Sequence, residues 1–100
     1  MAYKLIWSPA SRDDLRQIVS FISRDSRERA GAFGFRLISE TDKLETFPEI
    51  GRVVPEFQMV TIREIIVRSY RIVYRVDHAR KIVEIARVWH AARGTPEFEF

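Results

Sequence analysis

The chain has 100 residues, of which 46% are hydrophobic and 31% are charged, and it contains no cysteine. This length fits one domain with a single modest core, and the lack of cysteine excludes disulfide scaffolds and thiolate metal sites. The formal net charge of +3 arises in the second half of the chain, where the stretch from Arg63 to Arg93 carries eight basic and three acidic residues. Such a stretch suggests either an anionic partner or an ordinary solvated sheet face.

The sequence carries no sign of membrane insertion or export. No apolar run reaches the roughly 18–20 residues of a membrane-spanning helix, and Met1 to Lys4 does not begin a signal peptide. We therefore expect residues 1–100 to form one soluble cytoplasmic domain with no membrane partner. Residues 94–100 show no periodicity, and we expect a tail there that lies on the surface or meets a partner.

The first half predicts a strand followed by two helices. Residues 3–7 form a short apolar and aromatic run typical of a strand, and Ser8 with Pro9 is a favourable start for a helix. Two series of apolar side chains at helical spacing follow: Leu15, Ile18, Val19 and Ile22 in the first helix, and Ala30, Phe33, Leu37 and Leu44 in the second. Gly31 and Gly34 fall inside the second series, and we expect the two helices to approach each other closely there; the alternative is a kink in the second helix.

The second half predicts three strands after an irregular segment over residues 51–60. Residues 62–67 are rich in β-branched side chains, residues 70–76 alternate between two faces, and residues 81–90 form a third apolar run. We expect one face of the middle strand to be buried under the helices: Tyr70, Ile72, Tyr74 and Val76. The predicted fold class is α+β, in the order strand-helix-helix-strand-strand-strand, with a helical hairpin packed on one face of a mostly antiparallel sheet.

Most enzyme signatures are missing, and we expect neither a metal nor a cofactor. The sequence has no glycine-rich phosphate loop, no nucleophile elbow and no HExxH motif. His78 falls in a predicted hairpin turn and is expected to be exposed to solvent. His90 is more interesting, because a histidine close to Arg93 could transfer a proton while the arginine holds a phosphate. The alternative is a histidine at a strand end whose ring hydrogen-bonds the backbone.

Three arginines lie on neighbouring predicted strands: Arg63, Arg71 and Arg75. If these side chains share a face, they form a guanidinium patch suited to phosphate or carboxylate groups. The alternative is a solvated sheet face that binds nothing specific.

Five segments in this order are similar to one known family: Trp7-Ser8-Pro9-Ala10, Phe47-Pro48-Glu49-Ile50-Gly51-Arg52 with Val54-Pro55-Glu56, Ile62-Arg63-Glu64-Ile65, Tyr70 to Val76, and Ile85 to His90 with Arg93. Together they resemble the RelE/ParE superfamily of toxins from bacterial type II toxin–antitoxin systems. The resemblance implies the fold given above, a cognate antitoxin that wraps the toxin, growth inhibition and a role in plasmid stabilization. It also implies action either on mRNA in the ribosome, as in the RelE branch, or on DNA gyrase, as in the ParE branch.

The residues that matter in the RelE branch are only partly present. In that branch the resemblance implies basic residues on the sheet and an acid or base near the C-terminus, and Arg71 matches one family arginine. Ile65 and Ile66, however, stand where another basic residue would be wanted. No tyrosine follows Trp89, and residues 94–100 offer no general acid. We therefore expect the ParE-like activity, in which the toxin inhibits DNA gyrase by binding it.

Two alternatives stay open. The first is a ribosome-dependent mRNA endoribonuclease, whose candidate catalytic residues are Arg63, Arg71, His90 and Arg93. The second is a non-toxic binding module of the same fold. For target binding in general, the candidate residues are Arg63, Arg71, Arg75, Trp89, His90 and Arg93. The chain could also form a homodimer or a hetero-oligomer with its antitoxin.

Overall fold

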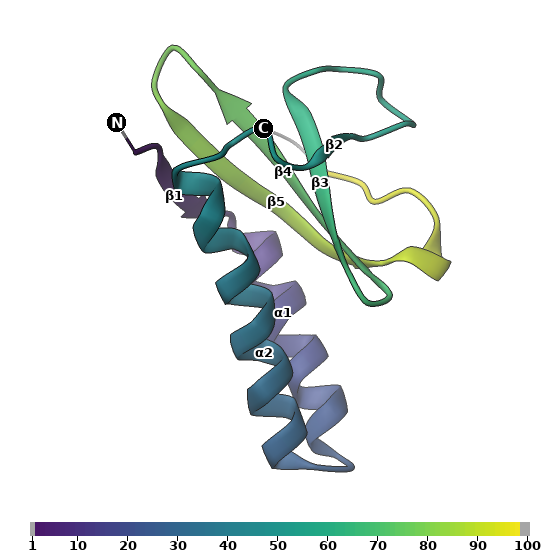
Figure 1. Cartoon of the computed structure of the whole chain (residues 1–100). Coiled ribbons are helices and arrows are strands. Elements are labelled where there is room, and N and C mark those ends of the chain that lie inside the picture. Colours follow the sequence, from purple (N-terminus) through teal and green to yellow (C-terminus); the bar gives the residue numbers. More distant parts are fainter. Residues whose placement is uncertain (1, 99–100) are drawn as a thin grey trace.

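The computed structural model describes residues 2–98, which form a five-stranded sheet and a hairpin of two long helices (Figure 1). The elements in chain order are β1 (Lys4–Trp7), α1 (Pro9–Ser23), α2 (Arg27–Asp42), the 3-10 turn η1 (Lys43–Glu45), β2 (Arg52–Val53), β3 (Ile62–Val67), β4 (Tyr70–Asp77), β5 (Ile82–His90) and the 3-10 turn η2 (Ala91–Arg93). The predicted fold class and element order are confirmed. No helix within residues 2–98 is long and apolar enough to cross a membrane.

The sheet has the strand order β1-β5-β4-β3-β2. The first strand pairs in parallel with the last, and all other pairs are antiparallel. The segment expected to be a loop or irregular edge contributes the short strand β2, because Arg52 and Val53 pair with Glu64 and Arg63 of β3. The helical hairpin lies on one face of the sheet, and its far end projects beyond the sheet (Figure 1).

Both helices begin at a serine that caps them. The Ser8 hydroxyl oxygen accepts a hydrogen bond from the Ser11 backbone N–H, and the Ser26 hydroxyl oxygen accepts one from the Arg29 backbone N–H, each at 3.1 Å. The predicted close approach of the helices is confirmed at Gly34, where an added Cβ would lie 2.9 Å from Cγ2 of Val19 in α1. It is wrong for Gly31, because an added Cβ there would meet nothing within 4 Å.

The main core lies between the hairpin and the sheet. The side chains of Leu37, Ile72 and Tyr74 are fully buried in it. The predicted inward face of β4 is confirmed, since Tyr70, Ile72, Tyr74 and Val76 all contribute to this core. The Tyr74 hydroxyl reaches the edge of the core and accepts a hydrogen bond of 2.9 Å from the Gly51 backbone N–H.

A smaller core lies on the opposite face of the sheet, which we call the second face. Val54, Ile62 and Val73 are buried there, and Phe57 and Phe98 pack against them with their ring centroids 5.2 Å apart. The expected surface tail therefore lies against the sheet over residues 94–98, with Pro96 buried; residues 99–100 lie outside the described part of the chain. The loop after β2 and this tail together cover the part of the second face around Val54, Ile62 and Val73.

Candidate functional site

The predicted guanidinium patch required Arg63, Arg71 and Arg75 to lie on one face of the sheet, and they do not. The β3–β4 register pairs Ile66 with Arg71, and Arg63 with Tyr74, so Arg71 and Arg63 lie on opposite faces of the sheet. The Arg63 guanidinium instead donates hydrogen bonds of 2.9 Å to the backbone carbonyls of Val60 and Gly51. Arg63 thereby ties the loop before β2 to the loop before β3.

Arg71 is the centre of a charged network on the second face. Its Nε lies 2.6 Å from Oε1 of Glu64, and its Nη1 and Nη2 lie 2.7 and 2.8 Å from the two carboxylate oxygens of Glu56. Nη1 also donates to the Gly94 carbonyl at 3.1 Å. The Glu64 side chain is fully buried, and Arg52 binds its second oxygen at 2.7 Å. All three nitrogens of the Arg71 guanidinium therefore bind carboxylates of the chain itself.

The network shifts the acid–base behaviour of Glu56 and Arg71. The hydrogen bonds from Arg71 are the main reason that the pKa of Glu56 falls from 4.5 to about 2. The hydrogen bonds to Glu56 and Glu64 raise the pKa of Arg71 above its ordinary value. The Glu56 carboxylate and the Arg71 guanidinium thus stabilise each other's charged forms.

This coupling predicts an acid-sensitive fold. A carboxyl whose pKa is lower in the folded state stabilises the fold above its unfolded pKa, and that contribution is lost as the pH falls. We expect the free energy of unfolding of the native chain to decrease between pH 4.5 and about 2, and Glu56→Gln to flatten this dependence. Urea denaturation across the pH range measures it. Glu45→Gln, which removes a carboxylate outside the network, is the control and should keep the native slope; equal slopes for Glu56→Gln and the native chain would contradict the assignment.

The end of β5 carries a second charged arrangement. Arg87 binds Asp14 of α1 through two contacts of 2.7 and 2.8 Å, and the same carboxylate accepts a bond of 3.0 Å from the Val88 N–H. The Arg87 and Arg93 guanidinium carbons lie 4.7 and 4.1 Å from the ring centroid of Trp89. Asp14 thereby fastens α1 along the part of β5 that extends beyond β1, and Trp89 orders both arginines by cation–π contact.

The two histidines occupy different settings. Nδ1 of His90 accepts a hydrogen bond of 3.1 Å from the Ala92 backbone N–H and so caps η2, which is the backbone-bonded alternative considered from the sequence. The His90 ring also packs edge-on against Tyr70, with centroids 5.2 Å apart. His78 is 46% exposed, in accord with its predicted turn, and its Nδ1 lies 2.7 Å from the Tyr3 hydroxyl.

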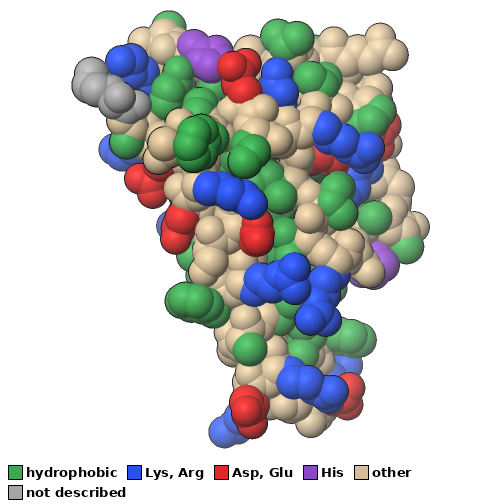
Figure 2. Space-filling model, viewed as in Figure 1, with side chains coloured by type: hydrophobic (Ala, Val, Ile, Leu, Met, Phe, Trp, Pro, Cys, Tyr) green, Lys and Arg blue, Asp and Glu red, His purple; other side chains and the backbone are tan. Residues whose placement is uncertain are grey.

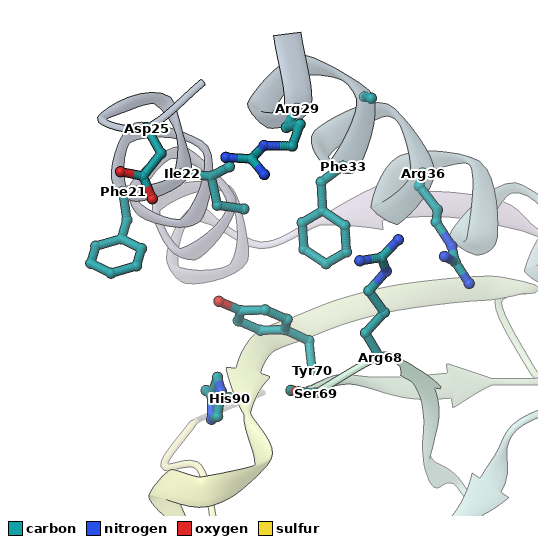
Figure 3. Close-up of a pocket in the computed structure, with 11 residues that line it drawn as sticks. Phe21, Ile22, Asp25, Arg29, Phe33, Arg36, Arg68, Ser69, Tyr70 and His90 are labelled. Atoms are coloured by element: carbon teal, nitrogen blue, oxygen red, sulfur yellow. The ribbon is translucent and has the colours of Figure 1, made fainter. Parts of the chain in front are cut away.

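A groove that sequence reasoning missed lies between the far end of the helical hairpin and the β3–β4 turn (Figure 3). We call it the hairpin groove. Its volume is about 580 Å³, and its walls are the apolar side chains of Phe21, Ile22, Phe33 and Tyr70 with Arg29, Arg36, Arg68 and one carboxylate, Asp25. Figure 3 shows Phe33 and Tyr70 pointing toward each other across it. The sequence does carry a sign of this groove, because Phe21 stands outside the apolar series predicted for the first helix.

A smaller hollow of about 350 Å³ adjoins the hairpin groove. The two share Phe21, Tyr70 and His90, and the smaller one adds Gln17 and Arg93. The structure therefore brings His90 and Arg93 together beside the groove and leaves Arg63, Arg71 and Arg75 elsewhere. Within residues 2–98, no group of acidic and histidine side chains could hold a metal ion.

Comparisons with known proteins found a matching family model, a relative in sequence and several similar folds. The model of the family described as "ParE toxin of type II toxin-antitoxin system, parDE" matches residues 5–94. A relative in Caulobacter vibrioides, Toxin RelE2, is 34% identical over 91 residues, covering 90% of this chain and 97% of that protein. The fold is also that of the chromosomal ParDE system from P. aeruginosa (TM-score 0.73, 17% identity, 89% of this chain and 96% of that chain). It is likewise that of a mutant of the E. coli toxin RelE in the free state (TM-score 0.69, 22% identity, 94% and 88%).

Proposed function

Because the chain belongs to the ParE toxin family of type II toxin–antitoxin systems, we propose that this toxin arrests growth by binding its target, DNA gyrase, and that it performs no chemistry of its own. The observation that carries this proposal is that Arg71 is already bound by carboxylates of the chain. Its guanidinium is bound by Glu56 and Glu64. The one arginine that matches the RelE branch is therefore unavailable to a phosphate.

The remaining groups do not complete a nuclease site. Cleavage of RNA by its 2′-hydroxyl needs a proton acceptor, a proton donor and a clamp for the phosphate. Arg63 lies on the opposite face of the sheet from Arg71, and Nδ1 of His90 is held by the backbone. An inhibitor that works by binding alone needs none of these groups in a common site.

A ribosome-dependent mRNA endoribonuclease is the second candidate. Two observations favour it: the relative at 34% identity is named as a RelE toxin, and His90 and Arg93 line one hollow. In this candidate, His90 would exchange a proton and Arg93 would hold the phosphate.

The experiment that separates the candidates is induction of the chain alone in bacteria, with DNA, RNA and protein synthesis followed separately. We expect a DNA-damage response while messages stay intact. An early stop in translation with cleaved messages would instead support the endoribonuclease. Normal growth with a folded protein would contradict both and would indicate a non-toxic binding module.

A substitution at His90 tests whether the toxin acts without catalysing a reaction. We expect His90→Gln, which keeps a polar side chain beside Trp89, to remain toxic, because no proton passes through this residue. In the endoribonuclease, loss of a general acid or base would slow cleavage by about 10²–10⁴-fold. Growth arrest after induction is the measurement, and His78→Gln in the β4–β5 turn is the matched control. A folded His90→Gln protein that binds antitoxin but no longer arrests growth would reverse the order of the two candidates.

We propose further that the hairpin groove receives the cognate antitoxin. Apolar walls surrounded by Arg29, Arg36 and Arg68, with only Asp25 opposing them among the lining residues, suit an acidic amphipathic segment. Apolar side chains would hold such a segment in the groove, and the charges at the rim would speed its approach.

The salt dependence of binding tests whether the antitoxin docks in the hairpin groove. We expect the association rate of toxin and antitoxin to fall as the salt concentration rises, while the dissociation rate changes less, because charges at a rim act mainly on encounter. Stopped-flow mixing measures both rates. Arg36→Gln should reduce the salt dependence, and Arg80→Gln in the distant β4–β5 turn should not. An association rate that is insensitive to salt would place the docking surface elsewhere.

A further inference from the structure

The solvent side of α2 carries an apolar stripe that no other part of residues 2–98 covers. Gly31, Phe35 and Ile38 follow one another at intervals of four and three residues, so they share one face of the helix. Phe35 is 73% exposed and Ile38 is 42% exposed. Figure 2 shows hydrophobic side chains exposed between charged ones along this helix. Exposed apolar side chains that adjoin on one helix face make that face a candidate contact surface.

The packing within a single chain does not explain why position 31 of α2 is a glycine. Glycine costs about 1 kcal/mol relative to alanine inside a helix, and Gly34 offsets that cost by allowing close contact with Val19. At Gly31 an added Cβ would meet nothing within 4 Å. The position is open to solvent, so the missing side chain leaves room in the stripe for a side chain of a second molecule.

The charges at the two ends of the stripe are opposite in sign and run against the helix dipole. Arg27 stands at the first position of α2 and Asp42 at the last, whereas a helix favours acidic groups at its start and basic groups at its end. Neither side chain has an ion-pair partner within residues 2–98. A charge placed against its own helix is expected where it serves another contact.

We infer that α2 is the interface of a homodimer, in which the α2 helices of two copies pack antiparallel about a two-fold axis near Gly34 and Phe35. In this arrangement residues equally distant from the axis face each other. Ile38 of one copy then packs against the open position at Gly31 of the second copy, and Arg27 meets Asp42 of the second copy at both ends. The antiparallel arrangement also places opposite ends of the two helix dipoles side by side.

The dimer is expected to be weak and to depend on concentration. A contact limited to one pair of helices buries less than the roughly 1,200–2,000 Å² of a standard stable interface. The homodimer needs neither the gyrase target nor the hairpin groove, since the stripe residues are separate from those that line the groove. It is therefore independent of the function proposed above.

Analytical ultracentrifugation of the full chain, from low to high micromolar concentration, tests the dimer. We expect a reversible monomer–dimer equilibrium. Gly31→Leu should raise the dissociation constant at least about tenfold by occupying the space that Ile38 of the second copy needs, as should Phe35→Ser at the centre of the contact. Both variants should fold, because leucine forms helices well and neither side chain is buried in the monomer. Phe47→Ser is the matched control, since Phe47 is similarly exposed, at 61%, and lies off the stripe.

A charge exchange tests the pairing itself. Arg27→Asp and Asp42→Arg should each weaken the dimer, and the double variant should restore it, because only an antiparallel contact brings these two positions together. Each single change agrees with the dipole of α2, so the fold should tolerate it. A chain that stays monomeric at the highest concentration would overturn the inference, as would a dimer that these variants leave unchanged. Loss of antitoxin binding in the variants of a monomeric chain would assign the stripe to the antitoxin instead.

Discussion

Replacement of Tyr74 by alanine is expected to lower the free energy of unfolding by about 3–5 kcal/mol. Tyr74 is the largest side chain that the fold buries completely, and it lies in the core between the hairpin and the sheet. Removal of its ring leaves a cavity that the neighbouring strands cannot close. Since a domain of this size is stable by only about 5–15 kcal/mol, Tyr74→Ala should be largely unfolded at modest urea concentrations.

The hydroxyl of Tyr74 contributes separately from the ring. Tyr74→Phe would leave the Gly51 N–H without its partner, and we expect a loss of about 1–3 kcal/mol. Tyr3→Phe is the control, because the Tyr3 hydroxyl bonds His78 in an exposed position and its loss should cost no more than about 0.5 kcal/mol. Urea denaturation of the three variants measures these differences. A loss below about 0.5 kcal/mol for Tyr74→Ala would show that the core has been placed wrongly.

Replacement of Arg71 by methionine is the second change with a large expected effect. The substitution keeps much of the side-chain volume but leaves Glu64 fully buried, with only Arg52 beside it. Removal of one partner from a buried ion pair costs about 3–5 kcal/mol. We expect a loss of stability of this size, measured by urea denaturation. Part of it should be recovered in the double variant with Glu64→Gln, because the glutamine no longer buries a charge.

The same variant separates a structural arginine from one that binds phosphate. If Arg71 serves the fold, the double variant with Glu64→Gln should regain toxicity along with stability. If Arg71 contacts a phosphate of the target, toxicity should stay low even when the protein is folded. Arg80→Met, at an exposed arginine in the β4–β5 turn, should change stability by no more than about 0.5 kcal/mol. A native stability for Arg71→Met would contradict the role of the charged network.

Gly51 has a role that its local sequence does not show. Its place after Pro48 suggests only a turn that ends the second helix, whereas α2 already ends at Asp42. In the structure an added Cβ at Gly51 would lie 2.5 Å from the Glu64 carbonyl oxygen and 2.6 Å from the Tyr74 hydroxyl oxygen. Glycine is therefore required by the close approach of β3 and β4, which no local pattern can show.

The features of this fold that can be predicted from the sequence are local and periodic. The alternation of β4 predicts that Ile72 and Tyr74 face the helices, and Ser8 with Pro9 predicts where the first helix begins. Each of these features depends on neighbours within one turn of helix or two residues of strand, so the order of residues suffices to predict it.

Which charged side chains meet depends on the folding of distant parts of the chain onto one another. Arg71 binds Glu56 fifteen residues away, and Arg87 binds Asp14 seventy-three residues away. Arg63 and Arg71 fall on opposite faces because the register of β3 against β4 places them there. A shift of the register by one residue would reverse this outcome without changing the alternation within either strand. The partners of a long charged side chain therefore depend on strand register and loop path, and these follow from the packing of the whole chain.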